Sequence, residues 1–133
     1  MRILIAEDDQ TCSLILESML KPYGSTVVVE DGEAAIRTVT SDLVNQQPFD
    51  LICLDIMMPG LDGQACLRCI RAIEYGFDRI GGAGAKILMT TGLDAPEAIM
   101  NAFRSQCEGY LVKPIDRARL HAQLSKLGYH PHQ

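Results

Sequence analysis

The segment LICLDIMMPGLDG, residues 51–63, decides how this chain folds. An unbroken apolar run, residues 51–54, leads straight to Asp55, and such a run is typical of a strand buried on both faces of a sheet. Pro59 and Gly60 then favour a loop, and Asp62-Gly63 precedes a helical pattern. A carboxylate at the tip of a buried strand adds nothing to packing, so we expect Asp55 to serve chemistry.

Short apolar runs alternate with segments of helical periodicity along the whole chain. We predict strands at residues 3–6, 26–29, 51–54, 87–90 and 110–112, and helices at about 10–20, 33–45, 63–74, 95–105 and 116–127. The first helix is predicted from the spacing of Leu14, Ile15, Ser18 and Met19, and residues 75–85 are predicted to form a surface loop. Apolar strands joined by helices indicate an α/β fold, a doubly wound parallel sheet with helices on both faces.

Composition restricts the class of protein. The chain has 133 residues, enough for one domain, and its 12 basic and 17 acidic residues give a net charge of −5. Because no cluster of Lys or Arg follows a helix or strand, we expect no direct contact with nucleic acid. The apolar run at residues 3–6 is too short for a signal peptide or a membrane span. Five cysteines without framework spacing favour reduced thiols, so we expect a cytoplasmic protein without membrane contact.

Polar side chains follow four of the predicted strands. These strand tips are Glu7-Asp8-Asp9, Asp55, Thr91-Gly92 and Lys113-Pro114. The carboxyl ends of parallel strands meet at one edge of a sheet, which is where such folds bind ligands. Crowded carboxylates repel one another, and Mg²⁺, which prefers oxygen ligands, would relieve that repulsion. Lys113 could pair with Asp55 or with a phosphoryl group, and Thr91 could donate a hydrogen bond to that group.

These tips together resemble the receiver domain of two-component response regulators. Residues 55–63, DIMMPGLDG, are similar to that family's phospho-acceptor segment, acid-x-x-Met-Pro-x-x-Asp-Gly. The resemblance spans residues 2 to about 127 and implies a flavodoxin-like (βα)5 sheet with strand order 2-1-3-4-5. We therefore expect a receiver domain over residues 1–128 and a short tail over 129–133, with no output domain.

The resemblance also implies a function as a phosphorylation-dependent signalling switch. Asp55 would accept a phosphoryl group from a sensor histidine kinase or phosphotransfer protein. The implied Mg²⁺ ligands are Glu7 (through water), Asp8, Asp55 and the backbone carbonyl of Met57. Thr91 and Lys113 would bind the phosphoryl oxygens, and Thr91 and Tyr110 would carry the switch. The chain would then be mainly a signalling protein that catalyses its own phosphorylation and dephosphorylation.

Several residues allow a simpler interpretation. Asp62 precedes a helix and is interpreted as its cap, and Asp9 is interpreted as a bystander beside the Glu7 and Asp8 pair. Thr90 is an alternative to Thr91, although alignment on the following small residue favours Thr91, and Tyr110 could equally be half-buried packing. Cys66 and Cys69 are three positions apart on one face of a predicted helix. Their thiols could form a redox or metal-binding pair.

Other functions remain open at the level of the whole chain. The switch could dock on an unidentified downstream protein, or the chain could be a phosphorelay intermediate. The family's usual contact surface, formed by the fourth helix, fifth strand and fifth helix, could also support a homodimer. A pseudo-receiver would bind partners without phosphorylation, and a flavodoxin-like redox protein would share the sheet order. The acids at residues 7–9 stand where a flavin protein needs a phosphate-binding loop, which argues against the redox protein.

Overall fold

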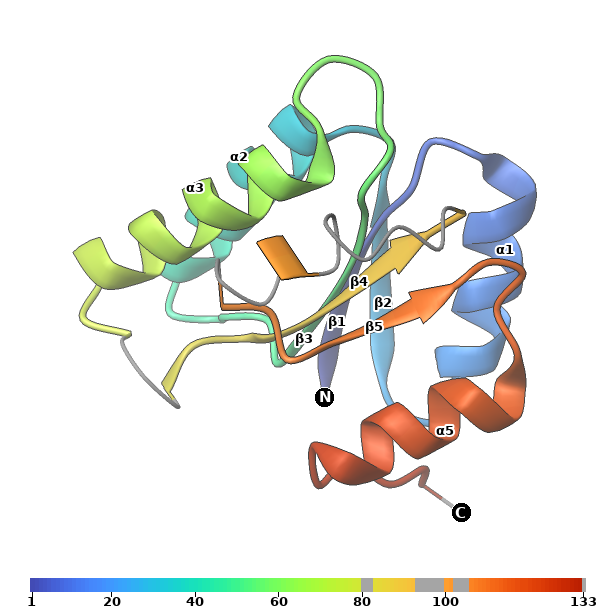
Figure 1. Ribbon diagram of the computed structural model, residues 1–133. Coiled ribbons are helices and arrows are strands. Elements are labelled where there is room, and N and C mark those ends of the chain that lie inside the picture. The colour runs from blue at the N-terminus through green and yellow to red at the C-terminus, as the bar shows by residue number, and fades with distance from the viewer. Residues whose placement is uncertain (80–82, 93–99, 102–105, 133) are drawn as a thin grey trace.

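The computed structural model describes residues 1–79, 83–92, 100–101 and 106–132, shown in Figure 1. Its elements in chain order are β1 (Arg2–Ala6), α1 (Gln10–Leu20), β2 (Ser25–Val29), α2 (Gly32–Val44), β3 (Leu51–Asp55), α3 (Gly63–Gly76), β4 (Lys86–Thr91), β5 (Gly109–Val112) and α5 (Arg117–Lys126). The fourth predicted helix, 95–105, lies outside the described residues except at positions 100 and 101. Within the described ranges no helix has the length and apolar character needed to cross a membrane.

The five strands form one parallel sheet in the order β2-β1-β3-β4-β5, which confirms the predicted fold class and strand order. The register places Ile5 beside Cys53, and Asp55 beside Thr90. β1 and β3 therefore lie in the middle of the sheet, and their carboxyl ends are next to each other. This order brings the acids after β1 next to the acid at the end of β3.

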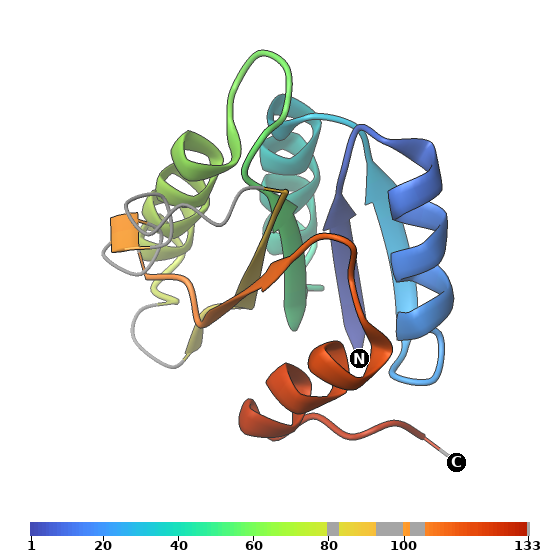
Figure 2. The same cartoon turned by 45° about the vertical axis from the view of Figure 1, so that its right-hand side comes forward.

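Helices cover both faces of the sheet. Figures 1 and 2 show α2 and α3 on one face and α1 and α5 on the other. Each face has its own apolar core: Leu4, Ile52 and Ile87 point toward α2 and α3, while Ile3, Leu51 and Leu88 belong to the core under α1 and α5. Alternate residues of one strand thus enter opposite cores, as the pleat requires. This two-sided burial explains why β1, β3 and β4 are apolar almost throughout.

β2 departs from that rule. The interpretation that every apolar strand is buried on both faces is wrong here, since Val27 and Val28 are 39% and 37% exposed. The strand order puts β2 at the edge of the sheet, with β1 as its single neighbouring strand. Valine is favoured in strands for its branched side chain as well as for burial, so composition alone does not separate an edge strand from a central one.

α1 turns a different face to the core than its most apolar residues suggest. Its buried residues are Ser13, Leu16 and Leu20, while Leu14 and Ile15 are 57% and 47% exposed. The helix itself was predicted correctly. Two large apolar side chains on its outer face remain without an explanation from packing.

Aspartate side chains cap the amino-terminal ends of α3 and α5. The Asp62 carboxylate accepts a hydrogen bond from Ala65 N at 2.9 Å, and the Asp116 carboxylate accepts one from Ala118 N at 2.7 Å. Asp62 is therefore the N-cap of α3, as predicted. α3 continues to Gly76, so the expected loop over 75–85 begins later than predicted, and residues 80–82 of that loop lie outside the described part. Arg71 and Glu74, on the last turns of α3, make the contacts that favour this extension.

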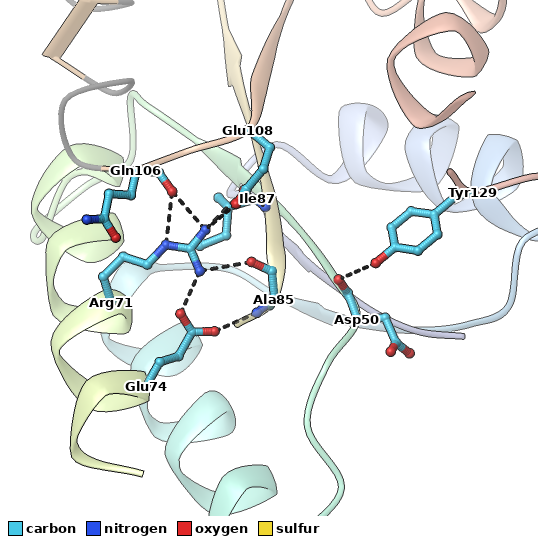
Figure 3. Close-up of polar contacts among 8 residues, drawn as sticks. All are labelled: Asp50, Arg71, Glu74, Ala85, Ile87, Gln106, Glu108 and Tyr129. Atoms are coloured by element: carbon cyan, nitrogen blue, oxygen red, sulfur yellow. Dashed lines mark hydrogen bonds and ion pairs between the residues drawn. The ribbon is translucent and has the colours of Figure 1, made fainter. Parts of the chain in front are cut away.

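Those contacts form a polar network at the amino-terminal ends of β4 and β5 (Figure 3). Arg71 donates through Nη1 to Glu74 Oε1 at 2.5 Å and to Ala85 O at 2.8 Å. The other side of the guanidinium donates to Gln106 O and to the Glu108 carboxylate. Glu74 is 3% exposed and accepts from Ala85 N at 2.7 Å. One arginine thus ties α3 to the chain entering β4 and to the chain entering β5.

Glu108 completes this network by bonding to both backbone groups of Ile87 on β4. Its carboxylate accepts a hydrogen bond from Ile87 N at 2.6 Å, and its own N donates to Ile87 O at 2.9 Å. Burial raises the pKa of the Glu108 carboxyl, although the Ile87 N–H and Arg71 act in the opposite direction. The start of β5 is thereby fixed to β4 one residue before the regular ladder begins.

We predict that Arg71→Ala lowers the free energy of unfolding by about 3–5 kcal/mol, because it leaves the buried Glu74 carboxylate without its cation. Urea denaturation followed by circular dichroism would measure the change. Arg68→Ala is the matched control, since Arg68 is an exposed arginine on the same helix, and its effect should stay within about 0.5 kcal/mol. Equal effects of the two substitutions would contradict the role given to Arg71.

Candidate functional site

The predicted site residues meet at the carboxyl-terminal edge of the sheet. β3 ends at Asp55, which is 2% exposed and lies between the ends of β1 and β4. Glu7 follows β1 directly and is 4% exposed, while Asp8 is exposed to solvent. The parallel sheet therefore does what the sequence predicted, bringing residues far apart in the chain to one edge.

Three carboxylates form a compact oxygen cluster there. One oxygen each from Glu7, Asp8 and Asp55 lies within 4.8 Å of the other two, the one such group found among the described residues. Glu7 is held in place from two sides, because its N donates to Val29 O at 3.0 Å and its Oε2 accepts from Asp9 N at 3.1 Å. A cluster of carboxylate oxygens, one of them open to solvent, suits a hard divalent cation that keeps some of its water.

Lys113 supplies the positive charge in the site. Its Nζ lies 2.5 Å from Glu7 Oε1 and 3.1 Å from Asp55 Oδ2. Burial alone would lower the pKa of the Lys113 ammonium, but the hydrogen bonds to Glu7 and Asp55, with the charges of both, raise it above its ordinary value. The ammonium therefore stays charged at neutral pH and offsets the repulsion between two buried carboxylates.

The loop after β3 positions the second oxygen of Asp55. Asp55 Oδ1 accepts a hydrogen bond from Met57 N at 3.1 Å. The loop then returns to the strand end, where Gly63 N donates to Ile56 O at 2.9 Å. A Cβ at Gly63 would lie 2.1 Å from the Asp55 carbonyl oxygen, so this close return requires glycine. The Met57 side chain is 60% exposed and stands beside the acid rather than over a core.

Thr91 ends β4 at the same edge and is 1% exposed. Its carbonyl accepts a hydrogen bond from Lys113 N at 2.7 Å, which fixes the end of β4 to the end of β5. Among the described residues, a Cβ added at Gly92 would meet no atom within 4 Å. Thr90 is also buried, and its carbonyl accepts from Ile56 N at 2.8 Å.

Tyr110 lies on β5 beside Met89 of β4, and its half-buried ring packs against the core under α2 and α3. This position agrees with the packing interpretation of Tyr110. Its role as a switch stays a prediction.

The remaining candidates occupy structural positions. Asp9 is the N-cap of α1 and accepts from Cys12 N at 3.1 Å, consistent with its interpretation as a bystander. Cys66 is buried, its thiol points to Gly32 O at 3.6 Å, and burial raises its pKa to about 12. Burial likewise raises the pKa of Cys53 to about 12. Thiols held in the protonated form are poor ligands and nucleophiles, which leaves little support for redox or metal use of the pair that includes Cys69.

Sequence reasoning missed the surface next to the acids. A hollow of about 190 Å³ between α1 and β2 is lined by Glu7 and Asp8 together with Leu14, Glu17, Val28 and Glu30. Leu14 and Val28 are the exposed apolar residues noted above, so an apolar patch directly adjoins the reactive edge. The sequence placed Leu14 on the periodic apolar stripe of the first helix, and only the orientation of α1 in the structure shows that this residue faces solvent beside the acids.

Comparison with known proteins gives a consistent result. The family model described as the response regulator receiver domain matches residues 3–125. The transcriptional regulatory protein ZraR of Escherichia coli K12 is 30% identical over 131 residues, which cover 98% of this chain and 27% of ZraR. The sensor protein GacS of Pseudomonas syringae is 32% identical over 120 residues, which cover 90% of this chain and 12% of GacS. The chain thus spans a small part of the length of these relatives.

Solved structures show the same fold. In a CheX–CheY–BeF3–Mg complex from Borrelia burgdorferi, the matching chain has a TM-score of 0.81 at 23% identity, covering 96% of this chain and 88% of that one. The receiver domain of the histidine kinase CKI1 from Arabidopsis thaliana, complexed with Mg²⁺ and BeF3⁻, has a TM-score of 0.80 at 23% identity, with 93% and 89% covered. At this level of identity the structural likeness establishes the fold, and the family model adds the sequence pattern. This chain belongs to the family of response regulator receiver domains of two-component signalling.

Proposed function

We propose that the protein is a phosphorylation-dependent signalling switch whose phospho-acceptor is Asp55. The observation that carries this proposal is a buried carboxylate at a strand end, 3.1 Å from the Lys113 ammonium and grouped with two further carboxylates. An acid in that setting is costly to bury, and phosphoryl transfer is a reaction that uses all of these groups. The donor is a sensor histidine kinase or a histidine phosphotransfer protein.

The transfer reaction needs one nucleophile. An Asp55 carboxylate oxygen attacks the phosphorus of a phosphohistidine on the donor. A new O–P bond forms as the P–N bond breaks, and the electron pair of that bond stays on the imidazole nitrogen, which later takes a proton from water. The product is an aspartyl phosphate on Asp55 and a free histidine on the donor. Positioning and charge stabilisation account for most of the catalysis in such transfers.

The carboxylates of Glu7, Asp8 and Asp55 fit a Mg²⁺ ion, since their oxygens are close enough to share one cation. Asp8 and Asp55 would bind directly, Glu7 through water, and the Met57 backbone carbonyl would add a further oxygen. The cation would neutralise the negative charge that develops on the transferred group. Lys113 already contacts Asp55, so its ammonium is in place to bind a phosphoryl oxygen there.

The Thr91 hydroxyl would donate a hydrogen bond to another phosphoryl oxygen. This contact would shift the chain that follows β4. Tyr110 would change position in step, and the altered surface would bind a downstream protein. The surface formed by the fourth helix, β5 and α5 would be that contact or a homodimer interface. We place the protein in the cytoplasm, where histidine kinases present their phosphohistidine.

The donor would dock on the apolar patch beside the acids, formed by Leu14 and Val28. Leu14 and Val28 line the same hollow as Glu7 and Asp8, so a donor helix that covers the patch brings its histidine to Asp55. Isolated exposed apolar residues are common on protein surfaces, but a group next to a reactive carboxylate is a reasonable contact surface.

A phosphorelay intermediate is the second candidate, and the relatives are compatible with either role. The matches include a transcriptional regulator and a sensor protein, so similarity alone does not separate a terminal switch from a relay. The two differ in the fate of the phosphoryl group. A relay passes it to a second histidine, whereas a switch loses it to water.

We expect incubation with acetyl phosphate and Mg²⁺ to add one phosphoryl group, measured as intact mass, and we expect Asp55→Ala to abolish the gain. Asp62→Ala is the matched control, because Asp62 is an acid of the same loop that caps α3 and should leave uptake intact. Wild-type protein that stays unmodified while folded would favour a docking module that works without phosphorylation. Uptake that persists in Asp55→Ala would assign the acceptor elsewhere.

We expect Leu14→Asp to slow phosphoryl transfer from a donor protein at least ten-fold, because a charge placed in an apolar contact costs more than about 1.4 kcal/mol. Uptake from acetyl phosphate should be unchanged, since that donor needs no docking surface. The donor is a purified kinase that phosphorylates the wild-type chain. Val44→Asp is the control, an exposed apolar residue at the end of α2. Equal loss with both donors would mean that Leu14 acts on the chemistry or the fold instead.

We predict that Met57→Asn accelerates self-dephosphorylation several-fold, because an amide next to Asp55 can orient the attacking water where an apolar side chain cannot. Phosphate release from the phosphorylated protein gives the rate. Met100→Asn is the control, an exposed methionine that is not part of the loop after β3. An unchanged rate in Met57→Asn would remove Met57 from the control of phosphoryl lifetime.

A further inference from the structure

The C-terminal segment, residues 128–132, folds back under the sheet at the edge opposite Asp55. Gly128 adopts a φ of +84°, which ends α5, and Tyr129 N donates to Leu124 O at 2.9 Å. The Tyr129 hydroxyl then donates to Asp50 O at 3.1 Å (Figure 3). Further along, His132 N donates to Pro22 O at 2.7 Å. The segment therefore contacts two parts of the domain that lie far from it in sequence.

Asp50 is a fixed point of the sheet. Its N donates to Arg2 O at 2.9 Å, and its carboxylate accepts from Arg2 N at 2.8 Å. The carbonyl that receives the Tyr129 hydroxyl also accepts from Lys86 N at 2.9 Å. The residue is thus bonded to the first residues of β1 and β4 and stands at the start of β3. A contact with Asp50 fastens Tyr129 to the three central strands at once.

A second attachment joins α5 to the connection between α1 and β2. The Tyr23 hydroxyl lies 2.5 Å from His121 Nδ1, and their ring centroids are 5.4 Å apart. Tyr23 is 1% exposed and belongs to the core under α1 and α5. Pro22, which receives His132 N, is the preceding residue. The connection between α1 and β2 therefore bonds both α5, through His121, and the C-terminal segment, through His132.

Beyond Tyr129, the segment is thinly packed. A hollow of about 490 Å³ adjoins it, lined by Tyr129, His130 and His132 on one side and by Tyr23 and Asp50 on the other. His130 and His132 are exposed, whereas the Tyr129 ring is half-buried against the core. Residues 130–132 thus depend on a backbone hydrogen bond rather than on apolar contacts. Segments held in this way open locally at a lower free energy than the whole domain.

We infer that residues 128–132 are a strap that fastens the C-terminal end of α5 to the amino-terminal edge of the sheet. The strap opens without unfolding the domain. With the strap closed, α5 is held at both ends. Tyr129 and His132 hold its C-terminal end, and the short chain from Lys113 holds its N-terminal end. With the strap open, α5 is still held to the domain through His121, Leu120 and Leu124. The strap therefore controls how freely α5 moves. This inference rests on the fold alone and stands whether or not Asp55 is the phospho-acceptor.

Hydrogen exchange of the full chain, followed residue by residue by NMR, tests the strap. Tyr129→Phe removes the hydroxyl and keeps the ring, and His132→Pro removes the amide that donates to Pro22. His130→Ala is the matched control on the same segment. We expect Tyr129→Phe to speed exchange of the α5 amides roughly five-fold, the factor that fits the loss of one ordinary hydrogen bond. His132→Pro should act in the same direction, and amides of α2 and α3 should keep their wild-type rates.

Three results would overturn the inference. Equal acceleration in α2, α3 and α5 would mean that Tyr129 contributes only to global stability. Unchanged α5 exchange in both variants would mean that the segment does not hold the helix. A His132 amide that exchanges at the unprotected rate in the wild-type chain would mean that the strap is not closed in solution. Selective acceleration in α5 by both variants, with none in His130→Ala, would establish it.

Discussion

The Lys113 ammonium, shared between Glu7 at 2.5 Å and Asp55 at 3.1 Å, makes a buried pair of carboxylates tolerable. Without a cation, two carboxylates at 4% and 2% exposure would repel each other at close range and would lose their hydration without compensation. These two ion pairs also link three strands, because Glu7 follows β1, Asp55 ends β3 and Lys113 follows β5. Both the chemistry and the closure of this edge of the sheet depend on them.

The two edges of the sheet are stabilised by different means. At the carboxyl-terminal edge the groups are charged, and Asp8 is open to solvent. At the opposite edge, Arg71 and Glu108 are committed to backbone groups, and Asp50 is bonded to its neighbours through the main chain. Fixed contacts at one edge allow rearrangement at the other without loss of the fold. Proteins that change shape locally need such a division between rigid and adjustable regions.

Much of this arrangement could be predicted from the sequence. The strand tips were identified because a parallel sheet brings the carboxyl ends of its strands together, whatever their separation in the chain. The Asp62 cap follows a local rule, so it was also found. The exposure of Leu14 and Val28 was missed because it depends on how a helix is rotated and on which strand lies at the edge. The Arg71 contacts and the fold-back of residues 128–132 were missed because both join segments with no shared pattern.

The position of β1 has a mechanical consequence. β1 lies between β2 and β3, so the beginning of the chain is held by two ladders of hydrogen bonds loaded in shear. The other end is held by the Tyr129 hydroxyl and by the His132 amide. A pulling force would break these two hydrogen bonds one after the other. Under tension between the two ends, the C-terminal segment and then α5 should peel away well before β1 slides out of the sheet. The molecule would thus extend in steps, and the edge that holds Asp55 would survive the first of them.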